Sequence, residues 1–421
     1  MKSKINIGLI GCGNIGSGFA EYLINKKHYD LKDINLKTIV VKDIKKKRNF
    51  NFNNITNNIN KVLKDPSIDI IVELIGGYAP IDYILAAIKN KKHIITANKA
   101  IISKYGEEIF KEANKNKVNV GLEACVCAGI PIINILTEQL KANKIESIEG
   151  ILNGTTNYIL NRMEEGISYG SALKLAQKEG FAEPDPTFDV KGYDSQQKLA
   201  ILASIAFKTK INPEDIYCEG IDKIKKHDIY FAKEHDKRIK LLGIAKKRGN
   251  KLELRVNPTL VDNAHQLASI NNENNGILIK GDLCGEQSYN GKGAGVGPTV
   301  SALISDLLDI STNHKNNIVK DIGAYSENNA DIIKIDYIKN RGYIWCPSID
   351  SPGVFAKESR VMAENSINME ELKNVKQFNN GPVSPDVIII SPTENYIINN
   401  SLKDLENLDC LKGKPYFMRM E

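Results

Sequence analysis

The residues best suited to catalysis lie close together near the middle of the chain. Asp194 and Lys198 follow the segment Ala182–Pro186, which contributes Glu183. If Asp194 begins a helix, Lys198 lies one turn later on the same face, so both side chains can contact one substrate. A carboxylate beside an amine that exchanges its proton is suited to proton transfer at an alcohol or a carbonyl. The alternative is a solvated salt bridge on a helix surface, which is the more frequent role of an Asp/Lys pair at this spacing.

The length and composition predict a globular protein of two or three domains. The chain has 421 residues, of which 42% are hydrophobic and 26% are charged. A single core does not extend over this length, and the composition is typical of soluble proteins. The net charge is +6, and the lysines are scattered apart from the run at residues 45–48. This distribution does not favour nucleic-acid binding.

The sequence shows no signal for a membrane or for secretion. No apolar stretch approaches the length of a membrane span, and no signal peptide begins the chain. The seven cysteines lie mostly far apart and include no C-x-x-C pair. We therefore expect reduced thiols in a cytoplasmic protein, and neither a disulfide framework nor a zinc site.

The beginning of the chain has the pattern of a dinucleotide-binding α/β domain. A β-branched run, Ile5–Ile10, leads into a G-x-G-x-x-G motif and then a helical pattern. In such a motif the glycines permit a tight turn, the approach of a pyrophosphate and close packing of helix on strand, while the helix N-terminus offers free N–H groups. The predicted cofactor-binding residues of this motif are Gly11, Gly13, Asn14, Ile15 and Gly16.

The end of the second predicted strand bears on the choice of cofactor. The strand Leu36–Val41 is followed by Lys42 and Asp43, and then by the basic residues 45–48. A basic residue here favours the 2′-phosphate of NADP(H), whereas an acidic residue favours the ribose of NAD(H). We expect a preference for NADP(H). Asp43 keeps NAD(H) open, and a solvated basic loop is the alternative for Lys42.

Two more strands, Ile68–Leu74 and His93–Thr96, are predicted to end at the same edge of the sheet. Gly76 follows the first of them and Lys99 the second. Ligands bind beyond the carboxyl ends of parallel strands, so Lys99 is predicted to lie near the nicotinamide. A purely structural lysine is the alternative.

Five motifs in order along the chain resemble homoserine dehydrogenases. They contain V-E-L-I-G-G at 72–77, T-A-N-K-A at 96–100, G-I-L-N-G-T-T-N-Y-I-L at 150–160, the segment 182–198, and G-A-G at 293–295 with Pro298 and Thr299. The resemblance runs from about residue 5 to 335. It implies an NAD(P)-dependent oxidoreductase that reversibly reduces L-aspartate 4-semialdehyde to L-homoserine, in the biosynthesis of threonine, methionine and isoleucine.

The resemblance also assigns roles to individual residues. Lys198 is expected to donate the proton to the aldehyde oxygen, with Asp194 binding substrate beside it. Glu183 is expected to hold the substrate amino group, Lys99 to position substrate and cofactor, and Gly295 to approach the cofactor. Two lysines near one oxygen are also expected to lower each other's pKa, which would ease proton exchange near neutral pH.

A loop at residues 123–131 resembles the monovalent-cation loop of the same family. The resemblance implies that Na⁺ or K⁺ is held by Glu123 and by the backbone of Val126, Ala128 and Ile130, and hard oxygen ligands suit such an ion. Cys127 stands where the family often has glycine. Cys125 and Cys127 also raise the alternative of a thioester-forming aldehyde dehydrogenase, but no histidine motif accompanies them, and we favour buried thiols.

The last eighty residues are predicted to form a separate regulatory domain. Strands and helices are expected in the order β-α-β-β-α-β, which is the ferredoxin-like arrangement. With the D-S-P-G-V turn at 350–354 it resembles an ACT domain, for which threonine is the expected effector. The alternative is a dimerising or inert appendage, because the fold alone does not determine a ligand.

The expected fold class is therefore α/β, with three parts. A Rossmann domain spans 1–135, with 305–335 returning to it, an α+β catalytic and dimerisation domain spans 136–304, and an ACT-like domain spans 340–421. We expect a homodimer or homotetramer. The alternative of another class is a nucleotide-binding sensor whose catalytic centre has decayed, which the presence of Lys99, Asp194 and Lys198 opposes.

Overall fold

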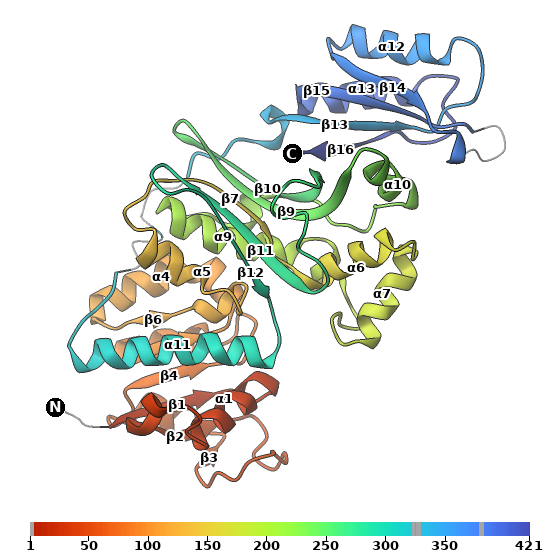
Figure 1. The fold of residues 1–421 in the computed structure, drawn as a ribbon. Coiled ribbons are helices and arrows are strands. Elements are labelled where there is room, and N and C mark those ends of the chain that lie inside the picture. The colour runs from red at the N-terminus through yellow and green to blue at the C-terminus, as the bar shows by residue number, and fades with distance from the viewer. Residues whose placement is uncertain (1–3, 322–324, 326–329, 379–382) are drawn as a thin grey trace.

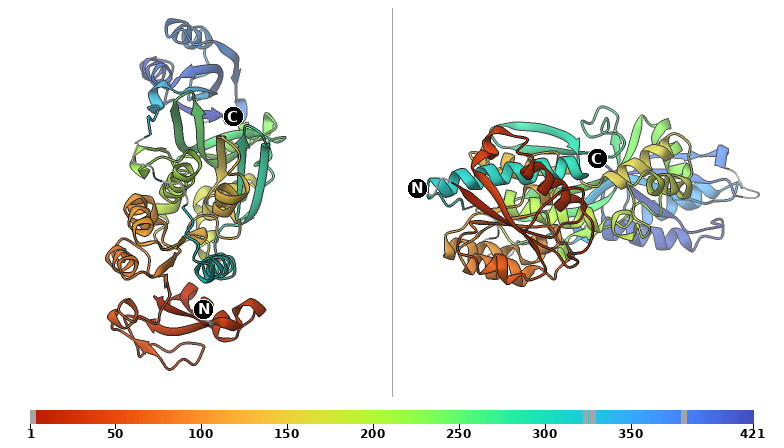
Figure 2. Two further views of the ribbon diagram at one scale, coloured as in Figure 1. Left: turned by 90° about the vertical axis from the view of Figure 1, so that its left-hand side faces the viewer. Right: turned by 90° about the horizontal axis from the view of Figure 1, so that it is seen from below.

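The chain folds into three parts that follow one another along a long axis. The computed structural model describes residues 4–321, 325, 330–378 and 383–421. The N-terminal sheet lies at one end, a larger mixed sheet occupies the middle, and the C-terminal part lies at the other end (Figures 1 and 2). Residues 322–324 and 326–329, within the segment predicted to return to the first domain, lie outside the described residues.

The N-terminal part is a six-stranded parallel sheet in the order β3-β2-β1-β4-β5-β6. Its central strands are β-branched runs that are buried on both faces, as expected for a parallel sheet covered by helices. This order confirms the predicted Rossmann-type domain. The strands are β1 (Ile5–Ile10), β2 (Ile34–Val40), β3 (Ile55–Thr56), β4 (Ile70–Glu73), β5 (His93–Thr96) and β6 (Val120–Gly121). The helices are α1 (Asn14–Ile24), α2 (Asn60–Leu63), α3 (Ile81–Lys89) and α4 (Lys99–Asn116).

A later helix, α11 (Val296–Lys315), returns to this sheet. Val296 and Val300 lie against Gly18 of α1, and Leu303 and Leu307 are buried in the same apolar core as β1. The return therefore begins at Val296, within the range 136–304 that the sequence assigned to the catalytic domain. The apolar spacing of α11 gave no indication of which sheet it covers.

The middle part is built on long antiparallel strands with α9 beneath them. Every residue of α9 from Gln197 to Ile205 is buried, because the helix lies between α4 of the first part and strands β7 and β9. The strands are β7 (Ile145–Ile151), β8 (Tyr217–Cys218), β9 (Lys237–Arg248), β10 (Lys251–Asp262), β11 (Asn274–Gly281) and β12 (Gly285–Lys292). The helices are α5 (Ile132–Asn134), α6 (Gly154–Glu164), α7 (Tyr169–Lys178), α8 (Thr187–Val190), α9 (Tyr193–Phe207) and α10 (Lys226–Glu234).

The C-terminal part has the predicted β-α-β-β-α-β order, and its strands lie in the order β16-β13-β15-β14. Strand β16 also pairs in parallel with β10 through Thr259–Arg419 and Leu260–Met420. The middle and C-terminal sheets are therefore one continuous sheet. The elements are β13 (Lys339–Cys346), α12 (Val354–Glu364), β14 (Met369–Asn374), β15 (Asp386–Glu394), α13 (Asn395–Glu406) and β16 (Tyr416–Met420).

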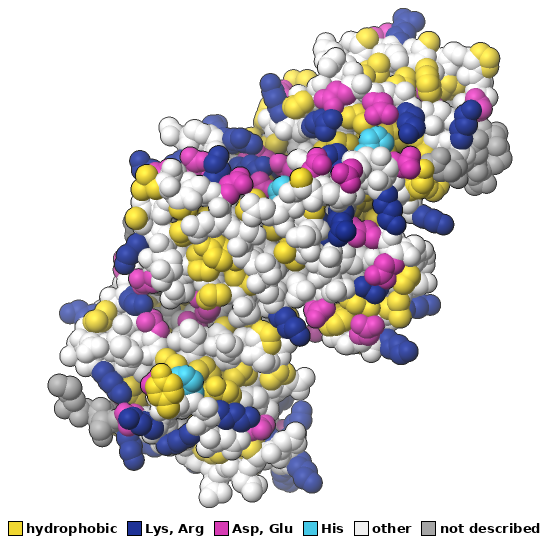
Figure 3. Space-filling view, viewed as in Figure 1, with side chains coloured by type: hydrophobic (Ala, Val, Ile, Leu, Met, Phe, Trp, Pro, Cys, Tyr) yellow, Lys and Arg dark blue, Asp and Glu magenta, His cyan; other side chains and the backbone are white. Residues whose placement is uncertain are grey.

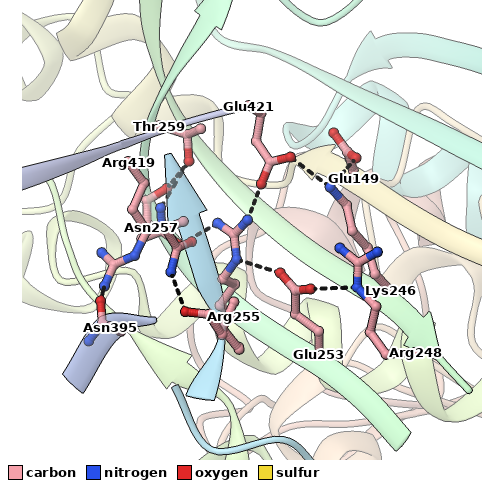
Figure 4. Close-up of polar contacts among 12 residues, drawn as sticks. Glu149, Lys246, Arg248, Glu253, Arg255, Asn257, Thr259, Asn395, Arg419 and Glu421 are labelled. Carbon is pink, nitrogen blue, oxygen red and sulfur yellow. Dashed lines mark hydrogen bonds and ion pairs between the residues drawn. The ribbon is translucent and has the colours of Figure 1, made fainter. Parts of the chain in front are cut away.

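A network of charged side chains crosses this junction (Figure 4). The guanidinium of Arg255, whose side chain is 2% exposed, donates to Glu253 at 2.9 Å, to Asn257 at 2.9 Å and to Glu421. Glu421 also pairs with Lys246 at 2.7 Å. Because a buried guanidinium is costly without partners, Glu421 contributes to holding β16 on β10.

Aromatic side chains form a second contact between the two parts. His227 of α10 stacks on Trp345 of β13, with ring centroids 3.7 Å apart and planes 1° from parallel. The buried carboxylate of Asp228 accepts hydrogen bonds from the hydroxyls of Tyr343 and Tyr416. Trp345 is the single tryptophan of the sequence, so its fluorescence reports on this junction.

The surface carries charged side chains of both signs, as the composition predicts (Figure 3). Acidic and basic side chains are interspersed over the middle and C-terminal parts on the face shown in Figure 3. Of the helices in the described residues, none is long and apolar enough to cross a membrane.

We predict that Glu421→Ala loosens the junction between the middle and C-terminal parts. Arg255 would lose one of its two carboxylate partners, at a cost of about 1–3 kcal/mol in the free energy of unfolding. Urea unfolding followed by Trp345 fluorescence measures this loss. The matched control is Glu370→Ala, which removes an exposed ion pair with Arg341 inside the C-terminal part. Equal stability of the two variants would contradict the role of Glu421.

Candidate active site

The first two turns of α9 carry the predicted carboxylate and amine, Asp194 and Lys198. Asp194 and Lys198 are both buried, and Lys198 Nζ lies 2.8 Å from Asp194 Oδ2. The helix begins at Tyr193 because Gly192 adopts the left-handed φ of +86°. The predicted one-turn pairing is confirmed. The burial of both groups rules out the alternative of a solvated surface salt bridge.

Lys99 reaches the same carboxylate from the N-terminal part. Its Nζ lies 3.1 Å from Asp194 Oδ1 and 5.7 Å from the ring centre of Phe188. Lys99 is the first residue of α4, and the side chain of Asn98 caps this helix by accepting from Ile101 N. Asn98 also donates to the Gly77 carbonyl at 2.8 Å, which ties the ends of β4 and β5 together. Asp194 thus bridges two lysines from different parts of the chain.

The end of β7 completes this group. The Leu152 carbonyl accepts a hydrogen bond from Lys198 Nζ at 2.7 Å. The side-chain amide of Asn153 donates to Asp194 Oδ2 at 2.8 Å and to Asp189 Oδ1 at 2.7 Å. Three separate elements, α4, α9 and the end of β7, therefore determine the position of one carboxylate.

The electrostatics of the group differ from the sequence-based expectation. Burial by itself would raise the pKa of Asp194, but the charges of Lys198 and Lys99 hold it well below its usual range. Burial by itself would lower the pKa of Lys198, but the charge of Asp194 outweighs it and raises that pKa. The prediction that the two lysines lower each other's pKa is wrong for Lys198. The reason is that the carboxylate lies between the two ammonium groups and attracts both.

The glycine-rich motif has the geometry of a phosphate-binding turn. Gly13 faces open space, since a β-carbon there would meet nothing within 4 Å. At Gly16 a β-carbon would lie 2.3 Å from the Gly11 carbonyl, so only glycine lets α1 approach the turn. No side chain of the described residues caps the N-terminus of α1, where Asn14 and Ile15 begin the helix. These N–H groups can therefore donate hydrogen bonds to a pyrophosphate.

Other predicted residues lie outside the cluster around Asp194. Lys42 is exposed just beyond β2, and Gly76, with φ of +84°, follows β4. Gly295 is the N-cap of α11, with φ of +108°. Glu183 is exposed. Among the described residues, its carboxylate forms no hydrogen bond or ion pair with Asp194 or Lys198.

The predicted cation loop lies beside the cluster. Glu123 is buried and accepts hydrogen bonds from Ile133 N and Asn134 N, both at 2.9 Å. Burial raises the pKa of Glu123 to about 7 despite these two bonds. The carbonyls of Val126 and Ala128 accept no hydrogen bond from any described residue, although both residues are buried.

The thiols near the site are buried and protonated. Cys125 donates to the Thr96 carbonyl at 3.3 Å, and Cys127 contacts Asn275 Nδ2 at 3.1 Å. Burial raises the pKa of both thiols, so neither is a ready nucleophile. This favours buried thiols over the thioester alternative. Cys127 has a left-handed φ of +48°, a conformation that glycine adopts more readily than other residues.

Two family models match most of the chain. The model described as homoserine dehydrogenase matches residues 131–308, and the model described as its NAD-binding domain matches residues 11–123. A homoserine dehydrogenase of Helicobacter pylori is 39% identical over 100% of both chains, and one from a Synechocystis species is 38% identical over 99% of each. The chain belongs to the homoserine dehydrogenase family. The solved homoserine dehydrogenase of Thiobacillus denitrificans is 35% identical, with a TM-score of 0.91 over 99% of this chain and 98% of that chain.

As a homoserine dehydrogenase, this chain is an NAD(P)-dependent oxidoreductase. It interconverts L-aspartate 4-semialdehyde and L-homoserine, a reaction of threonine and methionine biosynthesis. The cluster contains residue types that this chemistry can use, because ammonium groups stabilise a developing alkoxide and can transfer a proton. Lys99, Asp194 and Lys198, whose loss the sensor alternative requires, lie together in this cluster.

The contacts of Asn153 and of the Leu152 carbonyl with the cluster were not predicted from the sequence. Both residues lie within the block 150–160 that contributed to the family resemblance, but neither residue type suggests catalysis by itself. Asp189 is a further carboxylate of this group, bound by the Asn153 amide at 2.7 Å. Its pKa is raised, first by burial and then by the charge of Asp194.

We predict that Asp194→Asn shifts the pH dependence of homoserine oxidation. Lys198 must be neutral to accept the proton of an alcohol, and the charge of Asp194 raises its pKa. Without that charge the pKa of Lys198 falls, so the rise of kcat/KM with pH should move to lower pH while kcat decreases. The control is Asp222→Asn, which removes the charge that pairs with the exposed Lys191. An unchanged pH profile in Asp194→Asn would contradict the electrostatic coupling.

Proposed function

We propose that Lys198 is the proton donor and acceptor of the homoserine dehydrogenase reaction, with Asp194 and Lys99 as its partners. The observation that carries this is the buried Asp194 carboxylate, which holds Lys198 at 2.8 Å and Lys99 at 3.1 Å. A bound nicotinamide cofactor supplies the hydride for reduction. Lys198 donates its proton to the aldehyde oxygen, and Lys99 stabilises the charge that develops there.

The substrate is an amino acid, so its ammonium group needs a carboxylate. We assign this role to Glu183, whose exposed side chain is free to turn toward a ligand, and to Asp194 next to the reacting oxygen. The cofactor would lie along Gly11, Gly13, Asn14, Ile15 and Gly16, with Gly76, Lys99 and Gly295 at its other contacts. NADP(H) is the preferred form in this proposal, because Lys42 is exposed where a 2′-phosphate would lie. NAD(H) is the alternative.

A monovalent cation, Na⁺ or K⁺, fits the loop at residues 123–130. The orphan carbonyls of Val126 and Ala128 and the acid Glu123, whose pKa is raised to about 7, lack a positive partner among the described residues. The Ile130 carbonyl accepts one bond, from Ile132 N at 2.7 Å, and keeps a second lone pair. In the described part of the chain no group of three His, Cys, Asp or Glu side chains suits a metal. An ion here would thus be coordinated mainly by carbonyl oxygens and would stabilise the loop at residues 123–130.

The C-terminal part is proposed to be an ACT domain with threonine as its effector. Its support is the β-α-β-β-α-β order, the strand order β16-β13-β15-β14, and the turn before α12, where Gly353 has φ of +88°. A domain that serves only for dimerisation is the alternative.

The proposed division of the chain is a Rossmann domain at 1–135, a catalytic and dimerisation domain at 136–304, and the ACT domain at 340–421. The returning segment 305–335 is extended forward to Val296, where α11 begins, so the catalytic domain ends at Gly295. At its other end, Asp331 and Ile333 pair with Leu252 of β10, so these residues belong to the middle part. A homodimer or homotetramer is proposed. A cytoplasmic location is proposed because all seven cysteines are free thiols.

One assay compares these proposals directly. We expect L-homoserine to drive NADP⁺ reduction at alkaline pH, and this reduction should be faster than that of NAD⁺. The rate should be higher in Na⁺ or K⁺ than in choline, and added threonine should lower it. Absorbance of the reduced nicotinamide measures each arm. A folded protein that binds nucleotide but shows no homoserine-dependent signal would contradict the assignment of activity.

We predict that Lys198→Ala lowers kcat at least ~10²-fold, because general acid–base catalysis contributes that much. Thermal melting should show an intact fold. Lys191→Ala is the matched control, since Lys191 lies on the outer surface just before α9 and pairs with Asp222 at 2.8 Å. Full activity of Lys198→Ala would disprove the assigned role.

A further inference from the structure

Asn153 lies where the scaffold and the catalytic cluster meet. It follows β7, is 5% exposed, and is the N-cap of α6, because its Oδ1 accepts from Thr156 N at 2.8 Å. Its Nδ2 donates to both Asp189 Oδ1 and Asp194 Oδ2. One side chain therefore uses both ends of its amide, the oxygen for the helix and the nitrogen for two carboxylates.

The orientation of this amide follows from chemistry. The backbone N–H of Thr156 needs an acceptor, and only the amide oxygen supplies one. An ionised carboxylate only accepts, so Asp189 and Asp194 both require the NH₂ end. All three partners require the same orientation of the amide. In the reversed orientation, the NH₂ group would face the Thr156 N–H donor, and the amide oxygen would face two carboxylate acceptors.

The two donated bonds act on the charge balance of the site. Asp194 Oδ1 faces Lys99, and Oδ2 faces Lys198. A second carboxylate, Asp189, is bound by the same NH₂ group; burial raises its pKa, and the charge of nearby Asp194 raises it further. Between like charges, a shared NH₂ group lowers the repulsion and fixes the rotation of both carboxylates.

We propose that Asn153 is a positioning residue for the reaction, which orients Asp194 toward Lys198 and Lys99 and holds Asp189 beside it. It acts through these carboxylates and does not contact the reacting atoms. The inference rests on the proposed roles of Lys198 and Asp194. Its neighbour Leu152 binds the Lys198 ammonium through its carbonyl, so the end of β7 aligns both partners of the proton-transfer pair.

The capping role and the positioning role of Asn153 can be separated by two substitutions. Asn153→Ala removes both the cap and the carboxylate donors. Asn153→Ser restores a cap acceptor, since serine is a strong N-cap residue, but its short side chain has no NH₂ group for two carboxylates. Ser168→Ala is the matched control, because it removes the cap of α7, where Ser168 accepts from Ser171 N, away from the site.

We expect Asn153→Ser to recover the Tm that Asn153→Ala loses, yet to keep kcat for homoserine about 10- to 100-fold below the wild type. The KM for NADP⁺ should stay unchanged in both, and Ser168→Ala should lower Tm with normal kcat. Recovery of both Tm and kcat in Asn153→Ser would overturn the proposal, because capping would then be the only role. Lys198→Ala is measured in the same series, so that failure of the Asn153 proposal can be distinguished from failure of the proposed role of Lys198. Full activity of Lys198→Ala would disprove the role of Lys198, whereas full kcat of Asn153→Ser would disprove only the positioning role of Asn153.

Discussion

The Asp194 carboxylate is the interaction on which the rest of this structure depends. It is buried between Lys198 on its own helix and Lys99 from the N-terminal domain. Without it, the buried ammonium of Lys198 would lie near the partly exposed ammonium of Lys99 with no compensating charge, and without the two lysines the buried carboxylate would be protonated. Lys99, Asp194 and Lys198 therefore come together only when the two domains meet at the correct distance. On the proposed mechanism, the activity depends on how these domains pack. Burial by itself would lower the pKa of Lys198, but the charge of Asp194 raises it, which keeps the amine protonated and able to donate.

The scaffold satisfies this constraint by burying α9 on all sides. The helix has α4 against one side and strands β7 and β9 against the other, so its first turn is fixed relative to both domains. Gly192 permits the sharp entry to the helix, and the end of β7 supplies the Leu152 carbonyl and the Asn153 amide. A polar cluster at this depth is tolerated because each of these groups has a partner.

Local features of the site were predictable from the sequence, whereas its long-range contacts were not. The strand–glycine–helix order and the spacing of Asp194 and Lys198 depend on neighbouring residues, and both predictions are confirmed. The contact of Lys99 with Asp194 spans two domains. The strand order placed Lys99 near the nicotinamide and the family resemblance placed it near substrate with Lys198, but neither predicted its ion pair with Asp194. Asn153 was missed because an asparagine after a strand is most often just a helix cap. The pKa prediction failed because it counted the two lysines and treated Asp194 only as a ligand for substrate.

Strand β7 offers a physical connection between the C-terminal domain and the cluster. Glu149 of β7 pairs with Lys246 at 3.0 Å, and Lys246 pairs with Glu421 beyond β16. Three and four residues further along the chain come Leu152 and Asn153, which hold Lys198 and Asp194. A ligand on the C-terminal domain can alter catalysis only if it binds two arrangements of this junction with different affinity. The Glu421–Lys246–Glu149 pairs are one set of contacts through which such arrangements could act, since they link the residue after β16 to the strand that ends at the active site.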